Sequence, residues 1–116
     1  LLGISSYRQG HALSLGMPGM HGMAYNNHAI DQADLIIAVG MRFDDRVTGR
    51  ISTFAPRAKV VHIDIDPAEV GKNVRVEVPI VGDAQRVLRA LAREKLAALE
   101  WDPGVFELVQ QLHDAL

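Results

Sequence analysis

The chain has 116 residues, of which 48% are hydrophobic and 22% are charged, as in an ordinary globular domain. The formal net charge of −2 gives no sign of a nucleic-acid partner, and no apolar segment is long enough to cross a membrane. The chain contains no cysteine, which excludes disulfides and thiolate metal sites and favours a cytoplasmic location.

The first part of the chain predicts a long irregular segment followed by a short helix. Residues 5–24 are rich in glycine, serine, histidine and methionine, so we expect no regular element there. The glycines of Gly16–Gly22 do not have the spacing of a dinucleotide-binding loop. They allow a ligand to approach the backbone closely, and the nearby methionines fit either a flat aromatic ligand or simple core filling. A short helix is expected at 25–33.

Apolar, β-branched segments predict three parallel strands, at 35–39, 59–64 and 77–81. A long polar loop, with one turn near 51–54, separates the first two strands. Pro67 is expected to start a helical turn after the second strand.

An amphipathic helix is expected over 83–99, with Asp83 as its N-cap and one buried apolar stripe that includes Leu88 and Leu91. Residues 105–116 are expected to form a second amphipathic helix or a fraying tail. The alternation of strands with helical segments predicts an α/β fold with a three-layer, Rossmann-like parallel sheet. Because the sequence starts at Leu1 in what resembles the end of a strand, we expect an incomplete, truncated doubly wound domain.

The most informative segment follows the first predicted strand. Gly40–Gly49 contains Arg42 and Arg46 together with two aspartates. Ligands of open parallel sheets bind at the carboxyl ends of the strands, and arginine suits a diphosphate because it donates bidentate, charge-assisted hydrogen bonds. The alternative is a surface turn with two solvated ion pairs.

Two further strand exits carry carboxylates. Asp64 and Asp66 follow the second strand and, in an extended segment, point to the same side. They can accept hydrogen bonds from ribose hydroxyls; alternatively, Asp66 caps the turn at Pro67 and Asp64 is solvated. After the third strand, the amides at Gly82 and Asp83 are either available to a ligand or simply capped.

The histidines do not predict a metal site. His21 and His28 are seven residues apart, which differs from the spacing of a helical metal pair. His62 lies inside a predicted strand, where we expect a structural role. No nucleophile–base arrangement is visible, so no catalytic residue is expected.

Five characteristic segments follow one another along the chain: Gly19–Gly22, Asp34–Gly40, Arg42–Gly49, His62–Glu69 and Gly71–Asn73. With matching spacing from Leu1 to Ala92, these segments resemble the catalytic large subunit of the acetolactate synthase (acetohydroxyacid synthase) family. The run Arg-Phe-Asp-Asp-Arg-Val-Thr-Gly at 42–49 is the most specific of them.

The resemblance implies that residues 1–100 are part of the central, FAD-binding domain of a thiamine-diphosphate enzyme. Residues 101–116 would be a linker or C-terminal helix toward the next domain, and Leu1 and Leu2 would lie near the flavin ring system. The implied FAD-binding residues are Gly19, His21, Gly40, Met41, Arg42, Asp44, Arg46, Val47, Asp64, Ile65, Asp66, Glu69, Gly82, Asp83 and Ala84.

The resemblance also implies a parent enzyme that condenses pyruvate with a second 2-keto acid in branched-chain amino acid biosynthesis. Its thiamine diphosphate and Mg²⁺ would be bound by other domains of the same chain, so this fragment is expected to be inactive alone. A homo-oligomeric parent with a small regulatory subunit is implied as well. The alternatives are a related carboligase, such as glyoxylate carboligase, and a stand-alone nucleotide-binding regulatory module.

Overall fold

The computed structural model describes residues 6–94. The chain divides into two compact units, Leu15–Ala84 and the combination of Leu1–Ser14 with Gln85–Leu116, and each is described by itself. The predictions for residues 1–5 and 95–116 lie outside the described residues. They include the positions of Leu1 and Leu2, the end of the helix expected over 83–99, and the helix expected over 105–116.

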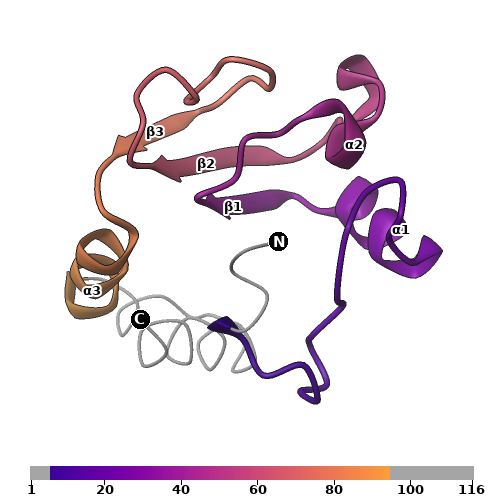
Figure 1. The fold of residues 1–116 in the computed structure, drawn as a ribbon, viewed down its shortest axis with the longest axis horizontal. Coiled ribbons are helices and arrows are strands. Elements are labelled where there is room, and N and C mark those ends of the chain that lie inside the picture. Colours follow the sequence, from indigo (N-terminus) through magenta and orange to yellow (C-terminus); the bar gives the residue numbers. More distant parts are fainter. Residues whose placement is uncertain (1–5, 95–116) are drawn as a thin grey trace. The chain divides into compact units, whose positions relative to one another are not determined.

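A three-stranded parallel sheet forms the centre of the larger unit (Figure 1). Its strands are β1 (Leu35–Val39), β2 (Lys59–Asp64) and β3 (Val78–Val81), in the spatial order β1-β2-β3. Leu35 lies opposite Lys59 in the first pair, and Val61 lies opposite Val78 in the second. The predicted strands and their parallel pairing are therefore confirmed, as is the α/β, Rossmann-like class. The carboxyl ends of all three strands lie at one edge of the sheet.

One face of the sheet carries the core of this unit. Ala38 on β1 and Val60 on β2 are 4% and 3% exposed, and Phe43, from the segment after β1, packs against them. Phe54 makes an edge-to-face contact with Phe43 at a ring-centroid distance of 5.8 Å. The segment that follows β1 is therefore anchored to the sheet through the buried Phe43 side chain.

The helices only partly follow the sequence prediction. α1 (Ala24–Gln32), the 3₁₀ turn η2 (Ile51–Thr53) and α3 (Ala84–Glu94) lie where helical structure was expected. A short helix, α2 (Asp45–Thr48), was not predicted. At Pro67 the expected turn is present as hydrogen-bonded turns over residues 67–71, although no helix is formed there. None of the helices within residues 6–94 has the length and apolar character required to cross a membrane.

α3 belongs to the second unit apart from its first residue, and it begins directly after Asp83, as predicted. On its predicted apolar stripe, Leu88 is 3% exposed, whereas Leu91 is 37% exposed. The stripe is therefore confirmed at Leu88, and the burial expected for Leu91 is not observed.

Candidate functional site

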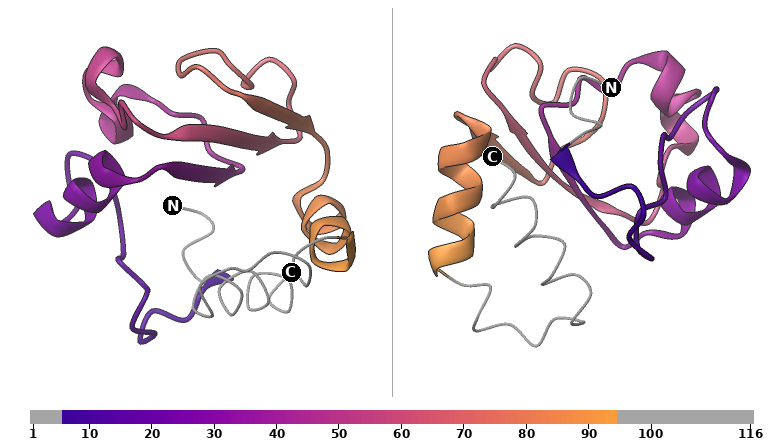
Figure 2. Two further views of the ribbon diagram at one scale, coloured as in Figure 1. Left: turned by 180° about the vertical axis from the view of Figure 1, so that it is seen from behind. Right: turned by 60° about the horizontal axis from the view of Figure 1, so that its bottom comes forward.

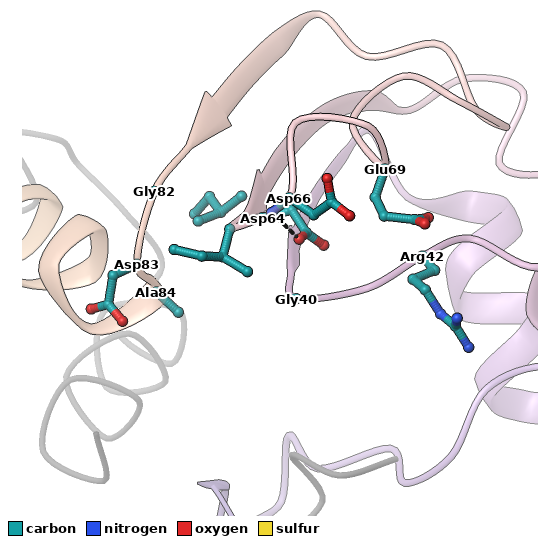
Figure 3. Close-up of a pocket in the computed structure, with 10 residues that line it drawn as sticks. Gly40, Arg42, Asp64, Asp66, Glu69, Gly82, Asp83 and Ala84 are labelled. Atoms are coloured by element: carbon teal, nitrogen blue, oxygen red, sulfur yellow. Dashed lines mark hydrogen bonds between the residues drawn. The ribbon is translucent and has the colours of Figure 1, made fainter.

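A pocket of about 580 Å³ opens where the three strands end (Figure 3). Its walls come from the residues that follow β1, from the end of β2 and its exit, and from the exit of β3. We call it the carboxyl-end pocket, and it is lined by Gly40, Arg42, Ile63, Asp64, Ile65, Asp66, Glu69, Gly82, Asp83 and Ala84. All of these except Ile63 are among the predicted FAD-binding residues, so the topology brings together residues that are more than 40 positions apart in sequence.

The two aspartates of the pocket are held by backbone hydrogen bonds. Asp64 Oδ1 accepts from the amide of Asp66 at 2.9 Å, and Asp66 Oδ1 accepts from the amide of Ala68 at 2.9 Å. Asp66 thus stabilises the turn at Pro67, as the alternative interpretation expected. Asp64 is only 8% exposed, so the solvated Asp64 of that alternative is wrong. These bonds fix both carboxylates through Oδ1, and Asp64 Oδ2 lies 3.8 Å from His62 Nε2.

The charges of the pocket are unevenly distributed. Four carboxylates, from Asp64, Asp66, Glu69 and Asp83, line it, and among its described lining residues Arg42 is the only cation. Figure 3 shows Asp64 and Asp66 in the middle, with Arg42 and Asp83 on opposite sides. Hydroxyl groups of a ligand suit the carboxylate region, whereas an anionic group suits the end that carries Arg42.

The glycines at the strand exits do not offer free amides. The Gly40 amide donates to the Ile63 carbonyl at 2.8 Å, and the Gly82 amide donates to the Asp64 carbonyl at 2.9 Å. Both bonds continue the parallel ladder beyond the strands. The interpretation of the Gly82 amide as a donor for a ligand is therefore wrong, and this glycine lines the pocket without supplying its amide.

A second pocket, of about 440 Å³, lies between the glycine-rich segment and α2. We call it the glycine-loop pocket. The predicted site residues Gly19, Arg46 and Val47 line it, and Asp45 also contributes. Figures 1 and 2 show α1 and α2 toward the amino ends of β1 and β2, away from the exits of the strands. Arg42 and Arg46 therefore line different pockets, although only three residues separate them.

Gly19 lies against the backbone of α2. A β-carbon at Gly19 would be 2.5 Å from the Arg46 carbonyl oxygen, and the Met20 amide donates to the same carbonyl at 2.8 Å. The side-chain amide of Asn27 on α1 holds this loop from the other side, because it accepts from the Gly19 amide and donates to the Gly19 carbonyl. The absence of a side chain at Gly19 thus allows the glycine-rich loop to pack closely against the backbone of α2.

The remaining predicted site residues line neither pocket. His21 is exposed, and Met41 packs on the buried core cluster. Asp44 caps α2, because its side chain accepts from the Val47 amide at 3.3 Å. These three predictions find no support in the two pockets, and the carboxylate of Asp44 already has a structural role.

Loss of this cap should destabilise the domain moderately. We expect Asp44→Ala to lower the free energy of unfolding by about 1 kcal/mol, because the α2 N-terminus loses a side-chain acceptor. Asp44→Asn should retain most of the stability, since an asparagine oxygen accepts the same bond. Urea unfolding followed by circular dichroism measures both, with the exposed Asp45→Ala as control. Equal stability of the Asp44→Ala variant and the wild type would contradict the capping role.

The structure also identifies supporting residues to which the sequence assigned no role in the site. Asn27 holds the glycine loop, and Asn73 Nδ2 donates to the carbonyls of Arg42 and Phe43. His62 is fully buried, and its Nε2 lies 2.6 Å from the Met41 carbonyl. His62 Nδ1 is buried without a hydrogen-bond partner, so only Nε2 has the structural role that was expected for this histidine. Within residues 6–94, no cluster of histidine and acidic side chains could hold a metal ion.

Comparison with known proteins assigns residues 1–91 to the family model described as "Thiamine pyrophosphate enzyme, central domain". The chain is 53% identical over 114 residues to the probable acetolactate synthase large subunit of Methanocaldococcus jannaschii, covering 93% of this chain and 19% of the relative. It is 49% identical over 112 residues to the acetolactate synthase large subunit of Corynebacterium glutamicum, covering 97% of this chain and 18% of the relative.

A plant relative extends this similarity. The chloroplastic acetolactate synthase 1 of Oryza sativa subsp. japonica is 55% identical over 91 residues, which is 78% of this chain and 14% of the relative. These matches confirm the resemblance that the motifs indicated. The chain spans less than a fifth of the length of these curated relatives.

Proposed function

Because the chain belongs to the family of thiamine pyrophosphate enzyme central domains, we propose that it is the FAD-binding part of an acetolactate synthase large subunit. The observation that carries the proposal is the carboxyl-end pocket, where Arg42 and four carboxylates converge from three strand exits. Its volume of about 580 Å³ lies within the range of small-molecule sites, ~300–1,000 Å³.

The donor and acceptor groups of the pocket fit the adenosine diphosphate half of FAD. Asp64, Asp66 and Glu69 present oxygens that can accept hydrogen bonds from ribose hydroxyls and the adenine amino group. Arg42 supplies the positive charge that a diphosphate requires. Glu69 also lies 3.6 Å from Lys72 Nζ, which offsets part of the negative charge on that side.

We further propose that the whole protein decarboxylates pyruvate and transfers the resulting two-carbon unit to a second 2-keto acid. Bound thiamine diphosphate and Mg²⁺ would supply that chemistry outside these 116 residues. The chain alone is therefore expected to form no acetolactate from pyruvate.

The proposed partners are the rest of the same parent chain, a second copy and a small regulatory subunit. A cytoplasmic location is also part of the proposal. The exposed apolar side chains of Leu35, Ile37 and Val78 on the sheet support a covering partner.

The proposal is tested with ligands that divide FAD into its parts. The full-length protein should quench the fluorescence of FAD on titration, and adenosine diphosphate should compete with it, because both carry the adenosine and diphosphate groups. Riboflavin has neither group and should compete poorly. Efficient competition by riboflavin without competition by adenosine diphosphate would contradict the assignment of the carboxyl-end pocket.

A further inference from the structure

The backbone that carries Arg42 is held by two side chains from distant parts of the sequence. His62 Nε2 lies 2.6 Å from the Met41 carbonyl and donates to it, since a carbonyl oxygen can only accept. Asn73 Nδ2 donates to the Arg42 carbonyl at 3.3 Å and to the Phe43 carbonyl at 3.1 Å. Three consecutive carbonyls, from Met41 to Phe43, therefore each accept a bond from a side chain.

This segment needs such support because its backbone is strained. Phe43 has φ = 52°, in the left-handed region that bulky residues avoid. Conformations of this kind persist only where the surroundings enforce them. Phe43 is 3% exposed and makes an edge-to-face contact with His62 at a ring-centroid distance of 5.1 Å. Burial fixes the Phe43 side chain, while the bonds from His62 and Asn73 fix the adjacent peptide groups.

Asn73 is placed to connect the two sides of the carboxyl-end pocket. It belongs to the loop between β2 and β3, close in sequence to Asp66 and Glu69, and it reaches the segment on which Arg42 lies. The orientation of its amide follows from chemistry, because only the NH₂ group can face two carbonyl oxygens. Its side chain is half-buried, so it can be altered with less disturbance of the core than the fully buried His62.

We propose that Asn73 is a positioning residue, which fixes the Arg42–Phe43 backbone so that the Arg42 guanidinium is held at the diphosphate end of the carboxyl-end pocket. The inference rests on the proposed FAD-binding function and deepens it. Asn73 does not itself line the pocket, so it acts on the ligand through Arg42. A merely structural role would instead weaken FAD binding whether or not Arg42 is present.

A double-mutant cycle in the full-length protein separates these two roles. Asn73→Ala, Arg42→Ala and the double variant are compared by fluorescence titration with FAD. Two neutral hydrogen bonds are lost, so Asn73→Ala should weaken FAD binding roughly three- to tenfold when Arg42 is present. In the Arg42→Ala background, the same substitution should change the affinity by less than about twofold.

The matched control removes an amide at the opposite end of the sheet. Gln32 Oε1 accepts a bond from the Arg57 guanidinium at 2.7 Å, next to the amino end of β2. Gln32→Ala should leave FAD affinity unchanged. Circular dichroism monitors folding, and Asn73→Ser provides the same cycle if Asn73→Ala does not fold, because serine is too short to reach both carbonyls.

Each outcome has a distinct meaning. An equal loss of affinity in both backgrounds, or no loss at all from the substitution of Asn73, would overturn the positioning role while leaving the FAD site intact. If Arg42→Ala alone has no effect, the assignment of Arg42 to the diphosphate fails, and the positioning role fails with it. Loss of the Asn73 effect in the Arg42→Ala background is the result that supports the inference.

Discussion

Replacing Arg42 by alanine should weaken FAD binding to the full-length protein by about one to two decades, while the fold is retained. Loss of a hydrogen bond to a charged group corresponds to roughly 1.5–3 kcal/mol, which gives this range of affinity. The side chain of Arg42 is exposed toward the pocket and makes no contribution to the buried core cluster. The effect should therefore fall on the ligand and leave folding largely unchanged.

The acidity of the carboxyl-end pocket makes this arginine more important than a single hydrogen bond suggests. Without Arg42, the charged side chains among the described lining residues would all be carboxylates. Like charges repel within one pocket, so the diphosphate would lose its attraction to Arg42 and remain near carboxylates that repel it. Arg42→Lys keeps the charge but not the bidentate geometry, and we expect it to bind FAD with intermediate affinity.

The control for Arg42 is Arg50→Ala, which removes an exposed arginine that lines neither pocket. Fluorescence titration with FAD gives the affinities, and circular dichroism reports folding. Wild-type affinity in Arg42→Ala would show that the diphosphate lies elsewhere. The surface ion-pair interpretation of the 42–49 segment would then be preferred.

The fold was predictable where the sequence pattern is local. The apolar, β-branched residues of 35–39 and 59–64 specify strands, as the nearly continuous hydrophobicity typical of parallel strands predicts. The convergence of Arg42, Asp64 and Gly82 also follows from topology, because the carboxyl ends of parallel strands share one edge.

What could not be predicted depends on contacts between distant segments. The Asp44 cap starts a helix of only four residues, too short for a periodic apolar pattern. The Gly82 amide donates a hydrogen bond to the Asp64 carbonyl, and the Met20 amide of the glycine-rich segment donates one to the Arg46 carbonyl in α2. Neither pairing leaves a signal in the local sequence. The same applies to Asn73, whose partners are 30 and 31 residues away along the chain.

The glycine at position 19 should be difficult to replace, because it combines a positive φ with a close approach to α2. We expect Gly19→Ala to lower the free energy of unfolding by about 2–4 kcal/mol, because backbone strain and overpacking act together. The backbone has φ = 94°, which L-residues rarely adopt, and the new methyl group would meet the Arg46 carbonyl oxygen at 2.5 Å and the Val47 Cα at 2.9 Å. Both neighbours are backbone atoms, so a change of side-chain rotamer cannot relieve the contact.

Alanine substitutions at two other glycines distinguish the effect of backbone strain from the effect of close packing. Gly16 has φ = 80° with no atom within 4 Å of its added β-carbon, whereas Gly10 has neither a positive φ nor a neighbour within that distance. Gly16→Ala should therefore cost about 1–2 kcal/mol for strain alone, and Gly10→Ala should remain within about 0.5 kcal/mol of wild type. Urea unfolding of the purified chain, followed by circular dichroism, ranks the three variants. If Gly19→Ala proves no less stable than Gly16→Ala, the loop does not approach α2 as closely as the structure indicates. If Gly19→Ala is the less stable, the difference between the two losses in free energy of unfolding measures the cost of disturbing the contact between the loop and α2.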